Sequence, residues 1–487
     1  MASARRGDGS GLSPVKFSRL ASRGVLLGLS GLRLAVLAAG GVVAVAALYA
    51  GGGKGVAYTA PIWVAALALV WLPAGGRRLV EWGPVAVDWT RRTLGGQTMF
   101  KKNPDKPRPA GTLALPGAAA ALRQHTDAAT GAVMVHDPHT ATLTGIVEIA
   151  HPSFMLLDPS DQERRVAAWG RVLATCCRSG RIARVQVLER TLPDEGTGLA
   201  DWWRAHGTPD GSWTSRVYED LIGRAGPASE RHATTISVAL DLKAAHRAVK
   251  SAGGGMGGAA AVLGQELDTL TTALRAADLA PAKRLDAADL AVILRAAYDP
   301  AAAAGLERHR DTGRDLAAAG PVAVRESWAS MRTDSAWHAV LWISEWPRAQ
   351  VYPGFLAHLL LASGARRAFS LTATPMRADQ AAKDIRRKKV EYVSDKAQRA
   401  RIGQIEDASQ HAEYQDVLQQ EADLTAGHGI VRYTGLIAVT ADTEDDLAAA
   451  VAAVEQGAIQ ASCETRVLAA QQAHAFTAAA LPLCRPI

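Results

Sequence analysis

Residues 34–53 read LAVLAAGGVVAVAALYAGGG, and residues 55–76 read GVAYTAPIWVAALALVWLPAGG. Neither stretch holds a charged residue, and Lys54 alone separates them. An α-helix needs about 20 mainly apolar residues to cross the hydrocarbon core of a bilayer, so each stretch is long enough to span a membrane. The short glycine-rich connection at 51–54 predicts that the two spans form a transmembrane helical hairpin.

Basic residues gather on both outer sides of these stretches. The chain of 487 residues has a net charge of +7 and a pI of about 9.3. Residues 1–33 and residues 77–110 each carry a net charge of +5, and a net charge of −4 remains for residues 111–487. The basic pI is therefore a topology signal, and direct nucleic-acid binding by the main body is not expected.

The positive-inside rule places both flanks, and hence both termini and the main body, in the cytoplasm. The sequence thus predicts a multi-pass protein of the cytoplasmic (inner) membrane. Trp63 and Trp71 lie in the second stretch and Trp82 and Trp89 just beyond it, as interfacial aromatic residues often do. The residues on which this topology rests are Arg23, Arg33, Lys54, Trp63, Trp71, Arg77 and Arg78.

Two other interpretations of the apolar region remain open. A cleaved signal peptide would also have a basic segment before an apolar one, but Leu48-Tyr49-Ala50 is a poor cleavage site and a second apolar stretch follows at once. A buried helical hairpin in a soluble domain is compatible with the alanine- and glycine-rich first stretch. Basic flanks on both sides favour the membrane hairpin over either alternative.

Beyond the hairpin, composition and periodicity predict an α+β cytoplasmic body. Strand-like runs at 184–188, 235–240, 337–344 and 430–440 alternate with helical patterns, including one long charged helix at 378–422. The strands are too few and too scattered for a long parallel sheet, which favours ferredoxin-like α/β layers in two related halves.

The predicted domain organisation follows these changes in composition. Its parts are a basic cytoplasmic tail (1–33), the two-span transmembrane hairpin (34–76), a basic Pro-rich linker (77–110), a first α+β domain (111–250), a flexible or helical connection (251–335) and a second α+β domain (336–487).

Catalytic motifs are missing from the sequence. It contains no GxxxxGK[ST] loop, no HExxH and no CxxC, and its four cysteines do not form a metal-binding spacing. We therefore predict no catalytic residue, no metal and no cofactor, and we expect that the protein is not an enzyme. The basic run 386–389 is interpreted as a solvated helix face rather than a phosphate-binding site.

The C-terminal stretch, which includes VTADTEDDLAAAV at 439–451, resembles the non-motor N-terminal region of the conjugation ATPases of type IV secretion systems. The matching residues, structural in that family, are Asp442, Glu444, Leu447, Gln471, Phe476, Leu481 and Pro482. The front end resembles the small two-span inner-membrane subunit of such systems. The whole chain is similar to a family in actinobacterial conjugative elements, but the motor half is absent.

This resemblance implies a membrane-anchored structural subunit of a conjugative DNA or protein transfer apparatus. It would dock a separate motor ATPase and other channel subunits at the inner membrane, as part of a larger oligomer. The alternative is an E-type component of the ESX (type VII) translocon, which also has two N-terminal spans and a cytoplasmic body without a motor. A membrane-tethered hydrolase with an unrecognised site is a further alternative.

Overall fold

The computed structural model describes residues 17, 30–74, 77–103, 105, 109, 111–150, 154–193, 197–208, 210–225, 230–308, 315–361, 364–402, 408–426 and 429–487. These residues divide into two compact units. One comprises residues 30–98 with 469–471, and the other comprises Phe17, residues 99–468 and residues 472–487.

The helices and strands have the following bounds. The helices are α1 (Gly31–Trp71), α2 (Leu79–Leu94), η1 (Gly117–Ala121), η2 (Phe154–Leu156), α3 (Pro159–Ser179), α4 (Thr197–His206), α5 (Trp213–Ala225), α6 (His246–Ser251), α7 (Gly255–Arg275), α8 (Ala287–Tyr298), α9 (Pro300–Arg308), α10 (Ala357–Leu360), α11 (Ala378–Ile402), α12 (Ala408–Thr425), α13 (Glu444–Gln460) and α14 (Gln472–Ala479). The strands are β1 (Pro73–Ala74), β2 (Arg77–Arg78), β3 (Met99–Lys101), β4 (Arg123–Thr126), β5 (Val133–Asp137), β6 (Thr142–Ala150), β7 (Ile182–Pro193), β8 (Glu230–Asp241), β9 (Ala280–Arg284), β10 (Ala323–Glu326), β11 (Met331–Arg332), β12 (Trp337–Glu345), β13 (Arg366–Pro375), β14 (Val431–Ala441) and β15 (Glu464–Val467).

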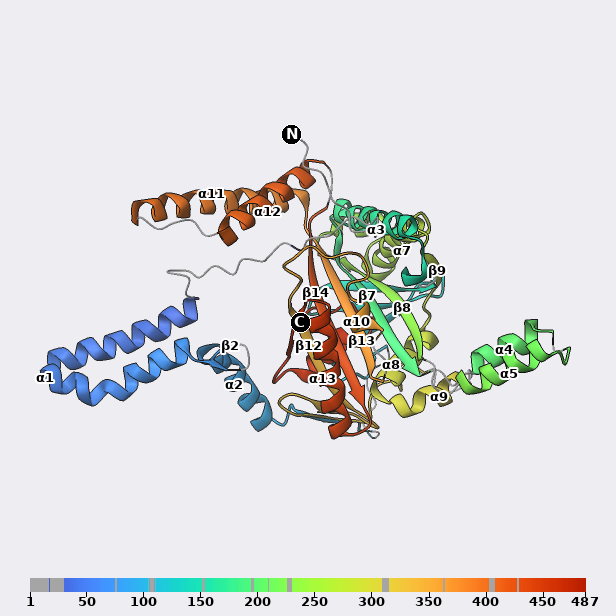
Figure 1. The fold of residues 1–487 in the computed structure, drawn as a ribbon, viewed down its shortest axis with the longest axis horizontal. Coiled ribbons are helices and arrows are strands. Elements are labelled where there is room, and N and C mark those ends of the chain that lie inside the picture. The colour runs from blue at the N-terminus through green and yellow to red at the C-terminus, as the bar shows by residue number, and fades with distance from the viewer. Residues whose placement is uncertain are drawn as a thin grey trace. The chain divides into compact units, whose positions relative to one another are not determined.

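Helix α1 folds back on itself at Gly52. This residue has φ 58° and ψ −145°, a conformation that interrupts the helix and that glycine adopts without a steric penalty. A Cβ placed on Gly40 would lie 2.9 Å from the Cβ of Ala66, so the segments before and after Gly52 lie side by side (Figure 1). The close approach requires glycine at position 40.

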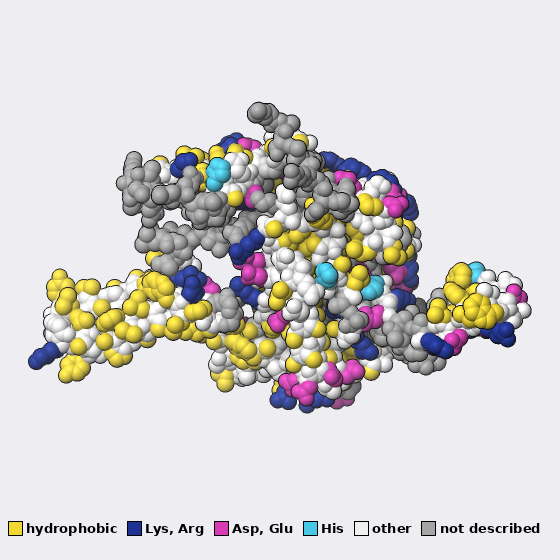
Figure 2. All heavy atoms as spheres, in the orientation of Figure 1, with side chains coloured by type: hydrophobic (Ala, Val, Ile, Leu, Met, Phe, Trp, Pro, Cys, Tyr) yellow, Lys and Arg dark blue, Asp and Glu magenta, His cyan; other side chains and the backbone are white. Residues whose placement is uncertain are grey.

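Hydrophobic side chains cover the surface of α1 (Figure 2). Among the described residues, Gly31–Trp71 is the one helix that is long and apolar enough to cross a membrane. Its apolar character agrees with a membrane location. The predicted multi-pass topology is not supported by a second candidate helix and stays a prediction.

The larger unit is built on one antiparallel sheet of 13 strands in the described part of the chain. The strand order is β3-β10-β11-β12-β14-β13-β7-β8-β6-β5-β4, with β15 beside β12 and β9 beside β6. The α+β class is therefore confirmed. The predicted ferredoxin-like layers and two related halves stay predictions.

One strand order recurs within this sheet. Strands β6 to β9 lie in the order β9-β6-β8-β7, and strands β12 to β15 lie in the order β15-β12-β14-β13. The two sets meet where β7 pairs with β13, with Arg190 opposite Ala368. Main-chain hydrogen bonds thus run without a break across strands from both parts of the sequence (Figure 1).

Helices cover both faces of the sheet. On one face, α3 and α7 pack on β6 and β8, while α13 packs on β12 and β14. On the other face, α8 and α14 cover the core that includes Leu188, Val340 and Leu436. Strand β8 is consequently buried on both sides from Thr234 to Leu240, which explains its unbroken run of small and branched residues.

The prediction of one long charged helix at 378–422 is wrong. The chain instead forms two helices, α11 and α12, that pack against each other (Figure 1). The rings of Tyr392 and Tyr414 stack with centroids 4.1 Å apart, and Lys389 Nζ lies 2.7 Å from Glu421 Oε2. Gly403 follows α11 directly in the sequence, and glycine commonly ends helices.

Residues 251–335, expected to form a flexible or helical connection, contribute directly to the core. Leu263, Leu267 and Leu290 are fully buried. The glycine-rich run at 253–258 joins α6 to α7, and Gly253, Gly254 and Gly255 have positive φ. These glycines therefore permit a tight turn between two packed helices rather than a flexible linker.

Candidate functional site

The open end of the α1 hairpin carries a small polar cluster. The Arg33 guanidinium lies 2.5 Å from Glu81 in the first turn of α2. The backbone N–H of Arg78 donates to the Glu81 carboxylate at 3.4 Å, and Arg78 Nη1 donates to the Trp71 carbonyl at 2.5 Å. Arg33 lies in the first turn of α1 and Trp71 is its last residue, so hydrogen bonds and an ion pair connect both ends of the hairpin to the start of α2.

The remaining residues of the topology prediction lie along or beside the hairpin. Lys54 is exposed next to the fold-back. The Trp63 indole N–H donates to the Val56 carbonyl at 3.4 Å, and Trp71 is 52% exposed. Arg77 pairs through its backbone with Ala74 in the β1–β2 ribbon, whereas Arg23 lies outside the described residues.

Phe17, which precedes α1, packs against the body. Its ring stacks on Trp346 with centroids 5.2 Å apart and meets the edge of Phe355 at 5.6 Å. Sequence reasoning missed this contact. The available signal was the one aromatic residue of the basic tail 1–33. The contact joins the segment before α1 to the sheet-containing unit after it.

The first group of C-terminal motif residues begins α13. Asp442 and Glu444 are exposed, and the nearest cation to Asp442 is Arg366 at 3.9 Å. Leu447 is buried beneath them in the core between α13 and the sheet. Thr443 is the N-cap, since its hydroxyl accepts from the Asp446 N–H at 3.1 Å. These acidic residues therefore form a helix start and are not brought together with other candidate residues.

Gln471, one of the motif residues, and its neighbour Gln472 lie in different surroundings. Gln471 lies in the turn before α14 and is half-buried. Gln472 is fully buried, accepts from the Val340 N–H at 2.8 Å and donates to the Leu468 carbonyl at 2.8 Å. Sequence reasoning could not separate two adjacent glutamines, because only the helix start decides which of them points inward.

The remaining motif residues lie at the centre of the sheet. Phe476 is buried, with ring centroids 5.1 Å from Tyr298 and 4.6 Å from His338. The Leu481 carbonyl accepts from Gln186 Nε2 at 3.1 Å, and the Pro482 carbonyl accepts from the Ser237 hydroxyl at 2.9 Å. All three are buried, and the role that the resemblance implies for them stays a prediction.

A buried ion pair anchors the same tail. Arg485 Nε lies 3.2 Å from Asp137 Oδ2, and both side chains are 5% exposed. The Asp137 carboxylate also accepts from the His139 N–H at 2.9 Å. An ion pair buried to this degree makes loss of either partner costly, because the remaining charge would lack its counter-ion. It ties the tail to strand β5.

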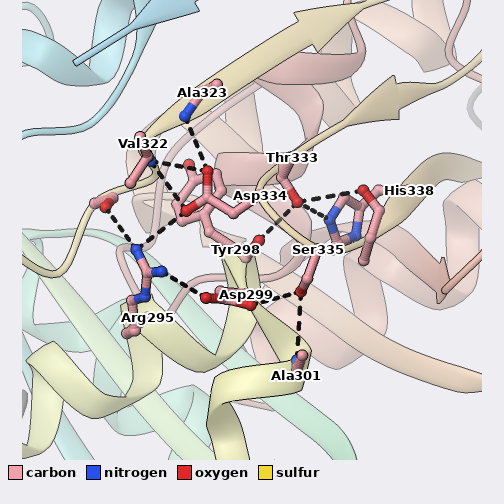
Figure 3. Close-up of polar contacts among 12 residues, drawn as sticks. Arg295, Tyr298, Asp299, Ala301, Val322, Ala323, Thr333, Asp334, Ser335 and His338 are labelled. Carbon is pink, nitrogen blue, oxygen red and sulfur yellow. Dashed lines mark hydrogen bonds and ion pairs between the residues drawn. The ribbon is translucent and has the colours of Figure 1, made fainter.

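A polar network joins α8 to the turn between β11 and β12 (Figure 3). Arg295 forms ion pairs with Asp299 at 2.5 Å and with Asp334 at 3.1 Å. Asp334 accepts from the backbone N–H groups of Val322 and Ala323 at 2.9 Å each. Every charged group drawn here has a partner, which is the pattern of a network that holds elements together.

His338 lies at the inner end of this network. One ring nitrogen is 2.7 Å from the Thr333 hydroxyl and the other is 2.8 Å from the Thr440 hydroxyl. Full burial lowers the pKa of His338 to about 3, because the charged imidazolium would lose its hydration. The ring is therefore neutral at physiological pH, with both nitrogens occupied. It acts as a cross-link between strands.

The thiols share this buried character. Burial raises the pKa of Cys176 to about 12 and that of Cys463 to about 11, so both are protonated at neutral pH. Among the described residues, no three His, Cys, Asp or Glu side chains are placed to hold a metal ion.

A cavity of about 60 Å³ lies between α8, α14 and the sheet. Arg190, Arg366, Thr440 and Phe476 are among its lining residues. It is far smaller than the 300–1,000 Å³ clefts that commonly bind small molecules, so its volume is suited to a few waters.

The network and the buried strands around it lie in the segment that matches a known family. The family model of EccE, described as a type VII ESX secretion system translocon, matches residues 228–343. The segment extends from the start of β8 through most of β12. No curated protein matches the chain.

This similarity supports a membrane component of a secretion system. It does not support the conjugative type IV assignment that the C-terminal motif had suggested. That motif consists of a helix start, a buried aromatic and a buried tail. Such features arise wherever a strand is followed by a packed helix, and they are therefore weak evidence for one family.

Proposed function

We propose that the chain is an EccE-type structural component of a type VII ESX translocon, anchored in the inner membrane by α1. The observation that carries this proposal is the match of residues 228–343 to the EccE family. The matched segment includes the buried strands β8 and β12 and the fully paired network of Arg295 and Asp334. An apolar N-terminal helix with an exposed surface accompanies it, as membrane anchoring requires.

The proposal includes a two-span topology with both ends in the cytoplasm. Phe17 lies before α1 and packs on Trp346, which lies after it. A single crossing would separate these two residues by the bilayer, so a chain that keeps this contact crosses an even number of times. The fold-back at Gly52 supplies two arms of suitable length, and the basic flanks favour the cytoplasmic side.

The body is proposed to bind other translocon subunits rather than to catalyse a reaction. The groups that most resemble catalytic ones are His338, which is buried and bonded on both ring nitrogens, and the thiols of Cys176, Cys463 and Cys484, which are buried. By contrast, the α4–α5 hairpin exposes Trp202, Trp213 and Leu221 at 53%, 71% and 58%. Large exposed apolar side chains in one place are typical of protein contacts. A separate motor ATPase is the partner that would supply energy.

The two recurrent strand sets are proposed to be related ferredoxin-like halves. Each set has the order fourth-first-third-second along the chain, and each has a pair of helices inserted between its second and third strands. The inserted pairs are α4–α5 and α11–α12. Two copies of one unit joined through β7 and β13 would explain the single wide sheet.

Co-purification tests the proposed role. A tagged chain isolated from native membranes in mild detergent is expected to bring down the ESX translocon subunits, including the motor ATPase. Trp213→Ser combined with Leu221→Ser should reduce their recovery, whereas Val322→Ser, at an exposed apolar position elsewhere, should not. Recovery of the chain alone from membranes that contain those subunits would contradict the proposal.

Cysteine labelling tests the topology separately. In intact cells without an outer barrier, a membrane-impermeant maleimide should label Lys54→Cys at the fold-back. The same reagent should label Asp445→Cys, exposed at the start of α13, only after lysis. Equal labelling of both positions before lysis would overturn the two-span arrangement.

A further inference from the structure

The outer face of α11 carries basic and apolar side chains along one stripe of the helix. Ala381, Ile385 and Tyr392 are buried and define the inner face that packs toward the protein. Residues on the opposite side, spaced three or four apart, are Lys383, Arg386, Arg387, Val390, Val393 and Ala397, all exposed. Two acidic residues, Asp384 and Glu391, lie along one edge of this stripe beside Arg387, and the other edge carries none.

The charges of this stripe are little neutralised by the protein itself. Arg387 forms an ion pair with Asp384 at 3.3 Å but remains 74% exposed. In the described part of the chain, Lys383 and Arg386 form no ion pair. The inner-face lysine, Lys389, instead pairs with Glu421 of α12 at 2.7 Å. Glu421 therefore balances Lys389 on the inner side, while Lys383 and Arg386 keep their positive charge on the outer side.

Two valines extend the basic stripe by one further turn. Val390 and Val393 are 65% and 58% exposed, and they follow Arg386 and Arg387 on the same face. A helix face that combines basic and exposed apolar side chains matches a surface of anionic headgroups above acyl chains. The phosphates of a nucleic-acid duplex would also pair with the basic residues, but they offer no apolar surface to the valines.

We propose that the outer face of α11 docks on the anionic cytoplasmic leaflet of the membrane that holds α1. This inference rests on the proposed membrane anchoring. Once α1 is inserted, the basic face is confined near a lipid surface, so a weak attraction that would fail in free solution becomes effective. The occupant is phospholipid with a negative headgroup, and charge complementarity together with the exposed valines identifies it.

The test uses the full chain in proteoliposomes, with an environment-sensitive fluorophore on Val390→Cys. Vesicles of phosphatidylcholine with and without phosphatidylglycerol both carry a quencher on their acyl chains. The expected result is quenching at least about twofold stronger with phosphatidylglycerol, and its loss at high salt. The matched control is Gln419→Cys, exposed on α12, which should show no such difference. Unsubstituted protein gives the background from the half-buried Cys177.

Charge variants test whether the face of α11, rather than the positive charge of the protein as a whole, attracts the anionic lipid. Lys383→Gln, Arg386→Gln and Arg387→Gln together should abolish the difference between the two lipids. Arg247→Gln, Lys250→Gln and Arg275→Gln remove the same charge from exposed positions on α6 and α7, and should preserve it. An equal loss in both triple variants would overturn the inference.

Three further outcomes also bear on the proposal. Equal quenching in the two lipids overturns the docking of α11, while retention of the chain after alkaline extraction shows that α1 is still inserted. Release of the chain by alkaline extraction contradicts the proposed anchoring instead. Short duplex DNA that removes the quenching at a concentration where added phosphatidylglycerol vesicles do not would assign the face to nucleic acid.

Discussion

Helix α1 and the sheet use the same residue types in opposite ways. Val42 and Leu48 of α1 are 67% and 54% exposed, whereas Val238 and Leu240 of β8 are fully buried. The strand is covered by helices on both faces, while the arms of α1 cover each other only along one narrow side. Hydrophobic composition alone therefore does not fix burial. The surroundings of an element decide whether its apolar side chains face protein or lipid.

The largest effect is expected where a charge is buried in the body. Asp137→Ala leaves Arg485 without its counter-ion and should lower the free energy of unfolding by about 3–5 kcal/mol. Urea unfolding of the full chain in detergent micelles measures it. Asp445→Ala, at an exposed site, should change little. A loss below about 1 kcal/mol would mean that the tail does not depend on this pair.

A charge placed on α1 tests the other half of the comparison, the helix whose apolar side chains are exposed. Val45→Arg puts a guanidinium on an exposed face near the middle of the first arm, which should cost about 2.5–3.5 kcal/mol of membrane insertion. Alkaline extraction of membranes should release more of this variant, while the unfolding midpoint of the body in detergent stays unchanged. A shifted midpoint with normal retention would show that α1 packs as a protein core helix.

Acid should weaken the body through His338. The folded pKa of about 3 lies below the ordinary 6.5, so the unfolded chain binds a proton that the folded chain does not. The stabilising contribution is complete above pH 6.5 and declines as pH falls toward 3, by about 2 kcal/mol at pH 5. Comparing the pH dependence of unfolding with that of His338→Asn isolates this group. The same pH dependence of the unfolding free energy in both proteins would contradict a contribution from His338.

The smallest expected effect concerns a helix start on the body. Thr443→Ala removes the hydroxyl that accepts from the Asp446 N–H and should lower the free energy of unfolding by about 1 kcal/mol. Thr443→Ser keeps the hydroxyl and should recover most of the loss. Equal losses in the two variants would assign the effect to the methyl group rather than to the cap.

Local signals predicted many elements well. The strands predicted at 184–188, 235–240, 337–344 and 430–440 correspond to β7, β8, β12 and β14 and follow from short-range periodicity. The joint between α11 and α12 was missed because the charged, polar pattern continues through it. Strands β9, β10 and β11 were missed because each is short and its stability comes from pairing with distant strands.

In the candidate site, too, some features follow from local sequence and others depend on distant contacts. The motif named Phe476, Leu481 and Pro482 as structural residues without placing them, and nothing local distinguishes Gln472 from Gln471. The partners of Phe17, His338 and Arg485 lie far away in the sequence, at 346, 440 and 137. Such contacts depend on strand order, which no local pattern records.

The sequence by itself determined the apolar arms, the basic flanks and the α+β class, because hydrophobicity and charge are properties of each segment. Only the tertiary structure decided that strands from both parts of the chain share one sheet through β7 and β13. It also decided that Phe17 returns to the body and that the outer face of α11 keeps its charge. These features depend on which surfaces meet, and burial and pairing are properties of two segments together.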